Sequence, residues 1–102
     1  MKKYKVVYSS MFYDDLTEIV LHIFEISQSK AIATRFYTNA IKAIEKRSNT
    51  ADCFEKFVPY EGAPDYYRIY FNKYIVFYTL ENEHMNVRRM LWCGSDIPGR
   101  IQ

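Results

Sequence analysis

The sequence has few of the residues that mark metal sites, disulfide frameworks or membrane spans. Its two cysteines, Cys53 and Cys93, are 40 positions apart with no CxxC spacing, and His22 and His84 are isolated, so we infer no metal site and expect no cofactor. No apolar run approaches the ~18 residues that cross a bilayer, and no apolar segment of the signal-peptide kind stands at the start. We therefore expect a soluble, cytoplasmic chain with reduced thiols and no membrane partner.

Net charge and length set further limits. Fourteen basic and twelve acidic residues leave a formal charge of +2, which is too small to indicate a nucleic-acid-binding protein. The C-terminal third has a mild basic bias, with Arg68, Lys73, Arg88, Arg89 and Arg100 against Glu81, Glu83 and Asp96. A chain of 102 residues builds one modest core, so we expect a single domain over residues 1–102.

Aromatic residues are abundant, with ten Tyr and seven Phe. This number of aromatic side chains exceeds what one small core needs. Because Tyr has an apolar body and a polar tip, the surplus indicates either a half-exposed face that meets a partner or the general preference of small sheets for aromatic residues.

Apolar spacing predicts two helices. After a short strand at residues 4–8, Ser9 and Ser10 suit a helix N-cap, and apolar residues then recur every three or four positions to about residue 26. Ser27-Gln28-Ser29 interrupts the pattern, and a second helix is expected from about Lys30 to Arg47. Helices joined by so few residues pack as an antiparallel hairpin.

The second half of the chain predicts a long loop followed by strands. Residues 49–65 contain Gly and Pro and no sustained period, which indicates a loop with a short helical turn near Cys53 to Phe57, serving either as a plain crossover or in function. Three β-rich runs then follow from residue 66 to residue 92, joined by polar turns at Asn72-Lys73 and at Glu81 to Glu83. This pattern predicts an antiparallel meander.

The order of elements, together with Tyr67-Arg68-Ile69 and Tyr74-Ile75-Val76-Phe77-Tyr78, resembles the RelE/ParE superfamily of bacterial toxins over nearly the whole chain. The resemblance implies an α+β fold of order β-α-α-β-β-β. In that fold the helical hairpin packs on one face of a mainly antiparallel four-stranded sheet. The other face of the sheet is then exposed unless something else covers it.

Alternation along the strands decides which side chains lie on that open face. It places Arg68 and Tyr70 there, whereas Tyr67, Ile69 and Phe71 belong to the core. In the next strand the open-face set is either Tyr74, Val76 and Tyr78 or Ile75, Phe77 and Thr79. Both sets are largely apolar, which suggests that a partner supplies the second layer and that the isolated chain dimerises or aggregates.

The last strand has two alternative phases. A β-bulge near Arg88-Arg89 would bring Met90 and Trp92 into phase with Val87. Without a bulge, Leu91 and Cys93 face the core and Trp92 lies on the open face. The choice also decides the orientation of Arg88 and Arg89.

The resemblance implies one of two activities, because RelE-like members cleave mRNA on the ribosome and ParE-like members poison DNA gyrase. RNA cleavage requires a proton acceptor, a proton donor and cations around the phosphate. The candidates for these catalytic roles are Arg68, Tyr70, Arg89 or Arg88, and Arg100.

Three features favour the ParE-like subgroup. Ile75 stands where many RNA-cleaving members have Arg, and the segment from Trp92 to Ser95 lacks the basic or His residues common there. Asp96-Ile97-Pro98 instead resembles the ending of many ParE-like members.

We therefore expect the toxin of a type II toxin-antitoxin module, of ParE-like character, which inhibits DNA gyrase and replication and is neutralised by a cognate antitoxin. It would assemble as a homodimer or as a heterotetramer with the antitoxin. The alternatives are a ribosome-dependent mRNA endonuclease and a non-toxic binding module. Without the resemblance, Arg68 is most simply a surface residue paired with Asp65 or Glu81. The residues expected to bind the antitoxin or the target are Arg68, Tyr70, Ile75, Phe77, Arg88, Trp92 and Asp96.

Overall fold

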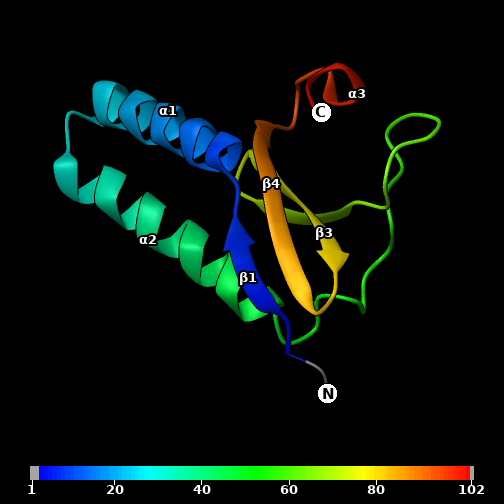
Figure 1. The fold of residues 1–102 in the computed structure, drawn as a ribbon. Helices are drawn as coiled ribbons and strands as arrows, with labels where there is room; N and C mark the ends of the chain where they lie inside the picture. The colour runs from blue at the N-terminus through cyan, green and yellow to red at the C-terminus, as the bar shows by residue number, and fades with distance from the viewer. Residues whose placement is uncertain (1–2, 102) are drawn as a thin grey trace.

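The computed structural model describes residues 3–101. In chain order it contains β1 (Lys5–Tyr8), α1 (Ser10–Ser27), α2 (Lys30–Arg47), β2 (Tyr67–Phe71), β3 (Tyr74–Glu81), β4 (His84–Trp92) and α3 (Ile97–Arg100). The strands form one sheet in the order β1-β4-β3-β2, with β1 parallel to β4 and the other neighbours antiparallel. The helices α1 and α2 lie side by side on one face of this sheet (Figure 1). The predicted α+β fold of order β-α-α-β-β-β is confirmed.

Both long helices begin at serine caps. The Ser9 hydroxyl accepts a hydrogen bond from the Phe12 backbone N–H at 3.1 Å, and the Ser29 hydroxyl accepts one from the Ile32 N–H at 3.2 Å. Gln28 ends α1 in the left-handed conformation, with a φ of 53°. α2 ends at Ser48 in the right-handed conformation, where the Ser48 N–H donates to the Glu45 carbonyl. The predicted bounds are confirmed.

The main core fills the space between the helical hairpin and the sheet. Alanine at position 40 is almost fully buried, which lets α2 approach closely, and Ile44 follows it on the same side of the helix. The helices contribute Phe12, Leu16, Ala40 and Ile44, and the sheet contributes Tyr67, Ile69, Val76, Tyr78, Met85, Val87 and Met90. Of the two alternatives for β3, Tyr74, Val76 and Tyr78 therefore face the helices.

A β-bulge in β4 resolves the phase of the last strand. Phe77 pairs with Arg89 and its neighbour Tyr78 pairs with Val87, so Arg88 is an extra residue in the ladder. Met90 consequently joins the same core as Val87, and Leu91 points to the opposite face. The bulge alternative is confirmed.

The expectation of an open second face is wrong. This face, opposite α1 and α2, carries a second core of Tyr66, Ile75, Phe77, Leu91 and Ile101, with Phe57 and Ile97 packed against it. The chain turns back after Trp92, so that the segment from Ile97 to Ile101 covers the strands. The loop contributes Phe57, which pairs with Tyr66 through backbone hydrogen bonds of 2.6 and 2.9 Å.

The predicted helical turn near Cys53 to Phe57 is also wrong, because this stretch contains two bends, at Cys53 and Phe54, followed by irregular backbone up to Phe57. The Phe57 backbone N–H and C=O are instead hydrogen-bonded to Tyr66. The Phe57–Tyr66 bridge extends the sheet beyond the start of β2. The loop is therefore held to the sheet, and it is more than a crossover.

Candidate functional site

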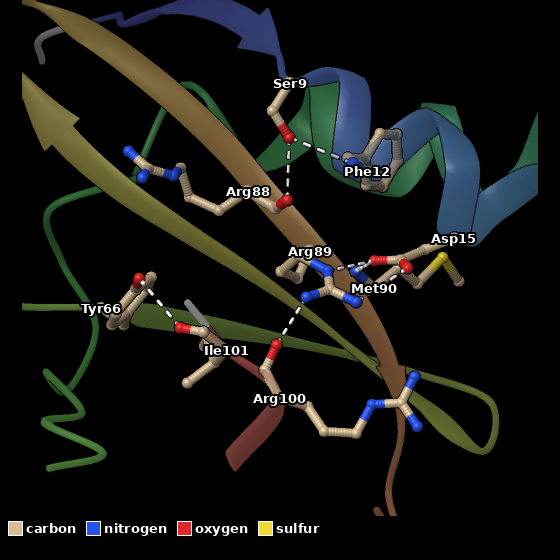
Figure 2. Close-up of polar contacts among 9 residues, drawn as sticks. All are labelled: Ser9, Phe12, Asp15, Tyr66, Arg88, Arg89, Met90, Arg100 and Ile101. Atoms are coloured by element: carbon tan, nitrogen blue, oxygen red, sulfur yellow. Dashed lines mark hydrogen bonds and ion pairs between the residues drawn. The ribbon is translucent and has the colours of Figure 1, made fainter. Parts of the chain in front are cut away.

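Arg89, one of the candidate catalytic residues, is engaged in a buried ion pair. Asp15 of α1 accepts hydrogen bonds from Arg89 Nε at 2.7 Å and from Arg89 Nη2 at 3.0 Å, and both side chains are 11% exposed. The hydrogen bond to Asp15 raises the pKa of Arg89. Figure 2 shows the guanidinium between this carboxylate and the backbone carbonyl of Arg100, to which it donates a further hydrogen bond.

The position of Asp15 follows from the length of β1. Because β1 ends opposite Val87, the outer edge of β4 has no strand neighbour beyond that point. The Asp15 carboxylate accepts a hydrogen bond from the Met90 backbone N–H at 3.0 Å on this free edge. One carboxylate thus stabilises α1, the β4 edge and, through Arg89, the C-terminal turn. Arg89 is structural in this arrangement, because its Nε, Nη1 and Nη2 atoms each donate a hydrogen bond within the chain.

Arg68 and Tyr70 lie on the second face of β2, as expected. The Arg68 guanidinium lies 4.6 Å from the centre of the Phe57 ring, and Tyr70 is 65% exposed. Among residues 3–101, no carboxylate lies within ion-pair distance of Arg68, and Asp65 pairs instead with Lys56 at 3.5 Å. The simple surface pair expected for Arg68 is therefore wrong.

The four candidate catalytic residues do not converge on one point. Arg68 lies opposite Phe77, which in turn lies opposite Arg89, so a buried aromatic ring separates the two arginines by about two strand spacings, or ~10 Å. The Arg100 side chain is exposed and lines a small cleft with Glu18 and Ser95. A single phosphate therefore does not meet all of these cations together.

Arg88 and Asp96 occupy separate positions. The Arg88 carbonyl accepts a hydrogen bond from the Ser9 hydroxyl at 2.8 Å, while its guanidinium extends away from this contact (Figure 2). Arg88 lines a cleft of about 250 Å³ with Ser10 and Asn86 at the start of α1. Asp96 precedes α3, and its carbonyl accepts the Arg100 N–H at 3.1 Å.

Two of the expected binding residues are not accessible. Ile75 is 8% exposed and Phe77 is fully buried beneath the loop and the C-terminal turn. Their apolarity, which suggested a partner, is satisfied within the chain.

Trp92 is accessible and marks a groove that the sequence did not predict. Its side chain is 56% exposed, and it lines a groove of about 630 Å³ between the far end of the helical hairpin and the end of the sheet. Ile26, in the last turn of α1, is 71% exposed beside it. The other lining residues are His22, Ile23, Phe36, Asn72, Lys73 and Tyr74.

The groove has rigid aromatic walls and a polar rim. Phe36 is in edge-to-face contact with Phe71 at 5.3 Å and with Tyr74 at 5.8 Å between ring centres. Lys73 and His22 supply the polar groups at the border. The arrangement suits an apolar segment of another protein that carries a carboxylate near its end.

Polar contacts outside this groove also hold the fold. The Tyr8 hydroxyl donates to Glu45 at 2.6 Å, and burial together with this hydrogen bond raises the pKa of Tyr8. The Tyr78 hydroxyl donates to the Ala51 carbonyl at 2.8 Å and accepts from Arg47 at 3.2 Å, and burial raises its pKa despite the Arg47 hydrogen bond. These phenols are structural groups.

Comparison of the chain with models of protein families, with curated proteins and with solved structures gave no match. No helix within residues 3–101 is long and apolar enough to cross a membrane. In the same part of the chain, no three His, Cys, Asp or Glu side chains gather in a way that could hold a metal ion. Function is therefore inferred from the residues and their geometry.

Proposed function

We propose that this chain is the toxin of a type II toxin-antitoxin module, of ParE-like character, which inhibits DNA gyrase and is neutralised by a cognate antitoxin. The β-α-α-β-β-β fold and the Tyr67-Arg68-Ile69 and Tyr74 to Tyr78 segments support the superfamily. The two segments lie in adjacent antiparallel strands of the sheet, β2 and β3.

The engagement of Arg89 by Asp15 is the observation that favours gyrase inhibition over RNA cleavage. A nuclease of this type requires cations and a proton donor around one scissile phosphate. Here one candidate cation is paired and nearly buried, and Phe77 separates it from Arg68. A toxin that acts by binding a protein target needs no such convergence.

The Trp92 groove supports an antitoxin partner. Exposed apolar side chains of α1 and β4 meet there, with Ile26 and Trp92 both more than half exposed. In type II modules the toxin is held by a small protein partner, and an apolar helix or extended segment is the chemistry that this groove accepts. The partner is expected to cover Trp92.

A supercoiling assay tests the proposal with purified components. The chain, added to DNA gyrase and relaxed plasmid, is expected to inhibit supercoiling and to leave broken plasmid after denaturation. Full gyrase activity at excess of the chain, with the chain shown to be folded, would overturn the proposed target.

A second candidate, a ribosome-dependent mRNA endonuclease, is favoured by Arg68 and Tyr70 alone. Both lie on the same face of β2, with no carboxylate near Arg68 among the described residues. In that case Arg68→Ala abolishes mRNA cleavage on ribosomes while the protein stays folded. Under the proposed function, ribosome-bound mRNA stays intact with either protein.

A further inference from the structure

The outer face of α2 carries a row of unpaired cations. Lys30, Arg35, Lys42 and Lys46 are all exposed, and none has an ion-pair partner within the part of the chain that the structure describes. Small and polar side chains lie between them, and several of these line a shallow depression with the cations. We call the set the α2 basic stripe, which consists of Lys30, Ala31, Thr34, Arg35, Thr38, Asn39, Lys42 and Lys46.

The charge is segregated between the two helices of the hairpin. α1 has no Lys or Arg, and its exposed acidic residues Asp14, Glu18 and Glu25 recur at helical spacing on its outer side. The carboxylate of α2, Glu45, is hydrogen-bonded to the Tyr8 hydroxyl of β1. The small net charge of +2 therefore results from one acidic and one basic helix face whose charges nearly cancel.

The α2 basic stripe has the chemistry of a phosphate-backbone contact. Lys and Arg together with Thr and Asn are the side chains that bind phosphate oxygens. From Lys30 to Lys46 the stripe extends about 24 Å along the helix, and a DNA duplex presents one negative charge per ~1.7 Å of its axis. Several phosphates are therefore within reach of the four cations.

Two features favour duplex DNA over RNA or single strands. None of the eight stripe residues is aromatic, so the stripe has no surface on which unpaired bases stack. An α-helix fits against the wide major groove of B-form DNA, which brings its exposed cations to the phosphates beside the groove, whereas the deep and narrow major groove of A-form RNA excludes a helix.

We propose that the α2 basic stripe binds the phosphate backbone of duplex DNA. The inference goes beyond gyrase inhibition and does not depend on it, because it concerns a face of α2 that has no part in the Trp92 groove. A competing occupant is the acidic α1 face of a second copy of this chain, which has complementary charge.

A matched pair of variants tests the proposal. One variant carries Lys30→Gln, Arg35→Gln and Lys42→Gln, and the control carries Lys3→Gln, Lys5→Gln and Lys56→Gln, three exposed lysines outside α2 and outside the Trp92 groove. Both lose three positive charges. Fluorescence anisotropy with a labelled DNA duplex of about 20 base pairs, between about 50 and 200 mM salt, measures the affinity and its salt dependence.

The wild-type chain is expected to bind with a slope of log affinity against log salt of about −3, from three or four phosphate contacts. The stripe variant is expected to bind at least about tenfold more weakly at ~50 mM salt, with a slope of about −1 because Lys46 remains, while the control stays within about threefold of wild type. Circular dichroism must show both variants folded.

Four outcomes would overturn the proposal. The first two are an equal loss of DNA affinity in both variants and no binding of DNA by the wild-type chain at about 50 mM salt. The third is tighter binding of a duplex RNA of the same length. The fourth is a salt-sensitive dimer that the stripe variant abolishes while its DNA affinity is unchanged. The last outcome would identify the second copy as the occupant.

Discussion

Substitution of Asp15 by Ala tests the role of the buried ion pair in holding three elements together. The change removes the acceptor for two hydrogen bonds from Arg89 and for the Met90 backbone N–H, at distances of 2.7 to 3.0 Å. It leaves a guanidinium that is largely shielded from solvent, since the Arg89 side chain is 11% exposed, without its hydrogen-bonded carboxylate; the remaining acidic side chain that acts on it is Glu18.

The size of the effect follows from these contacts. Removing one partner of a buried pair costs about 3 to 5 kcal/mol, and an orphaned backbone N–H adds about 1 kcal/mol. Since some solvent reaches the pair, we expect a loss near the lower end, about 3 kcal/mol. A domain of this size has a free energy of unfolding of about 5 to 15 kcal/mol, so the loss is a large fraction of the total.

Urea denaturation followed by circular dichroism measures this loss. With an m value of about 1.5 kcal/mol/M, the midpoint is expected to fall by about 2 M. Asp14→Ala is the matched control, because Asp14 is exposed with no ion-pair partner within residues 3–101, and its effect is expected to stay within about 0.5 kcal/mol. A loss below about 1 kcal/mol for Asp15→Ala would refute the reasoning.

Three other substitutions test separate parts of the structure. Above pH ~10 the raised pKa keeps Tyr8 protonated in the folded state while it ionises in the unfolded state, so the wild-type free energy of unfolding falls as pH rises. Tyr8→Phe is expected to reduce this fall by about 1.4 kcal/mol per pH unit, and an unchanged dependence of the free energy of unfolding on pH, from urea titrations, contradicts this. Ile101→Ala is expected to cost about 2 to 4 kcal/mol in urea if the C-terminal turn covers the second face, and a neutral effect argues against that cover. Gly94→Ala is expected to displace the indole of Trp92, since a Cβ there collides with the ring, and thus to change acrylamide quenching of the only tryptophan; unchanged quenching contradicts the packing.

The sequence predicted the element order well because the signals there are local. Serine caps and apolar spacing determine α1 and α2, and short polar turns delimit the strands. Phase along one strand is also local, which is why Arg68 and Tyr70 were assigned to the correct face. The bulge in β4 was recognised as one of two options, and only pairing across strands decided between them.

The candidate site was harder to predict, because its geometry depends on contacts between distant residues. Asp15 and Arg89 are 74 positions apart, and nothing in either local pattern indicates their ion pair. The cover of Ile75 and Phe77 by the C-terminal turn is equally non-local. The α2 basic stripe, by contrast, could have been found in part from the sequence, because Arg35, Lys42 and Lys46 recur at helical spacing.

We propose that this chain is a toxin that stops DNA replication. The most direct measurement is induction of the chain in a bacterium, with incorporation of labelled thymidine and labelled amino acid followed over the first minutes, against the same gene with a stop codon after Arg47. An early fall in thymidine incorporation with broken chromosomes is the expected result. An early fall in amino-acid incorporation would instead indicate the endonuclease, and no fall in either would contradict toxicity.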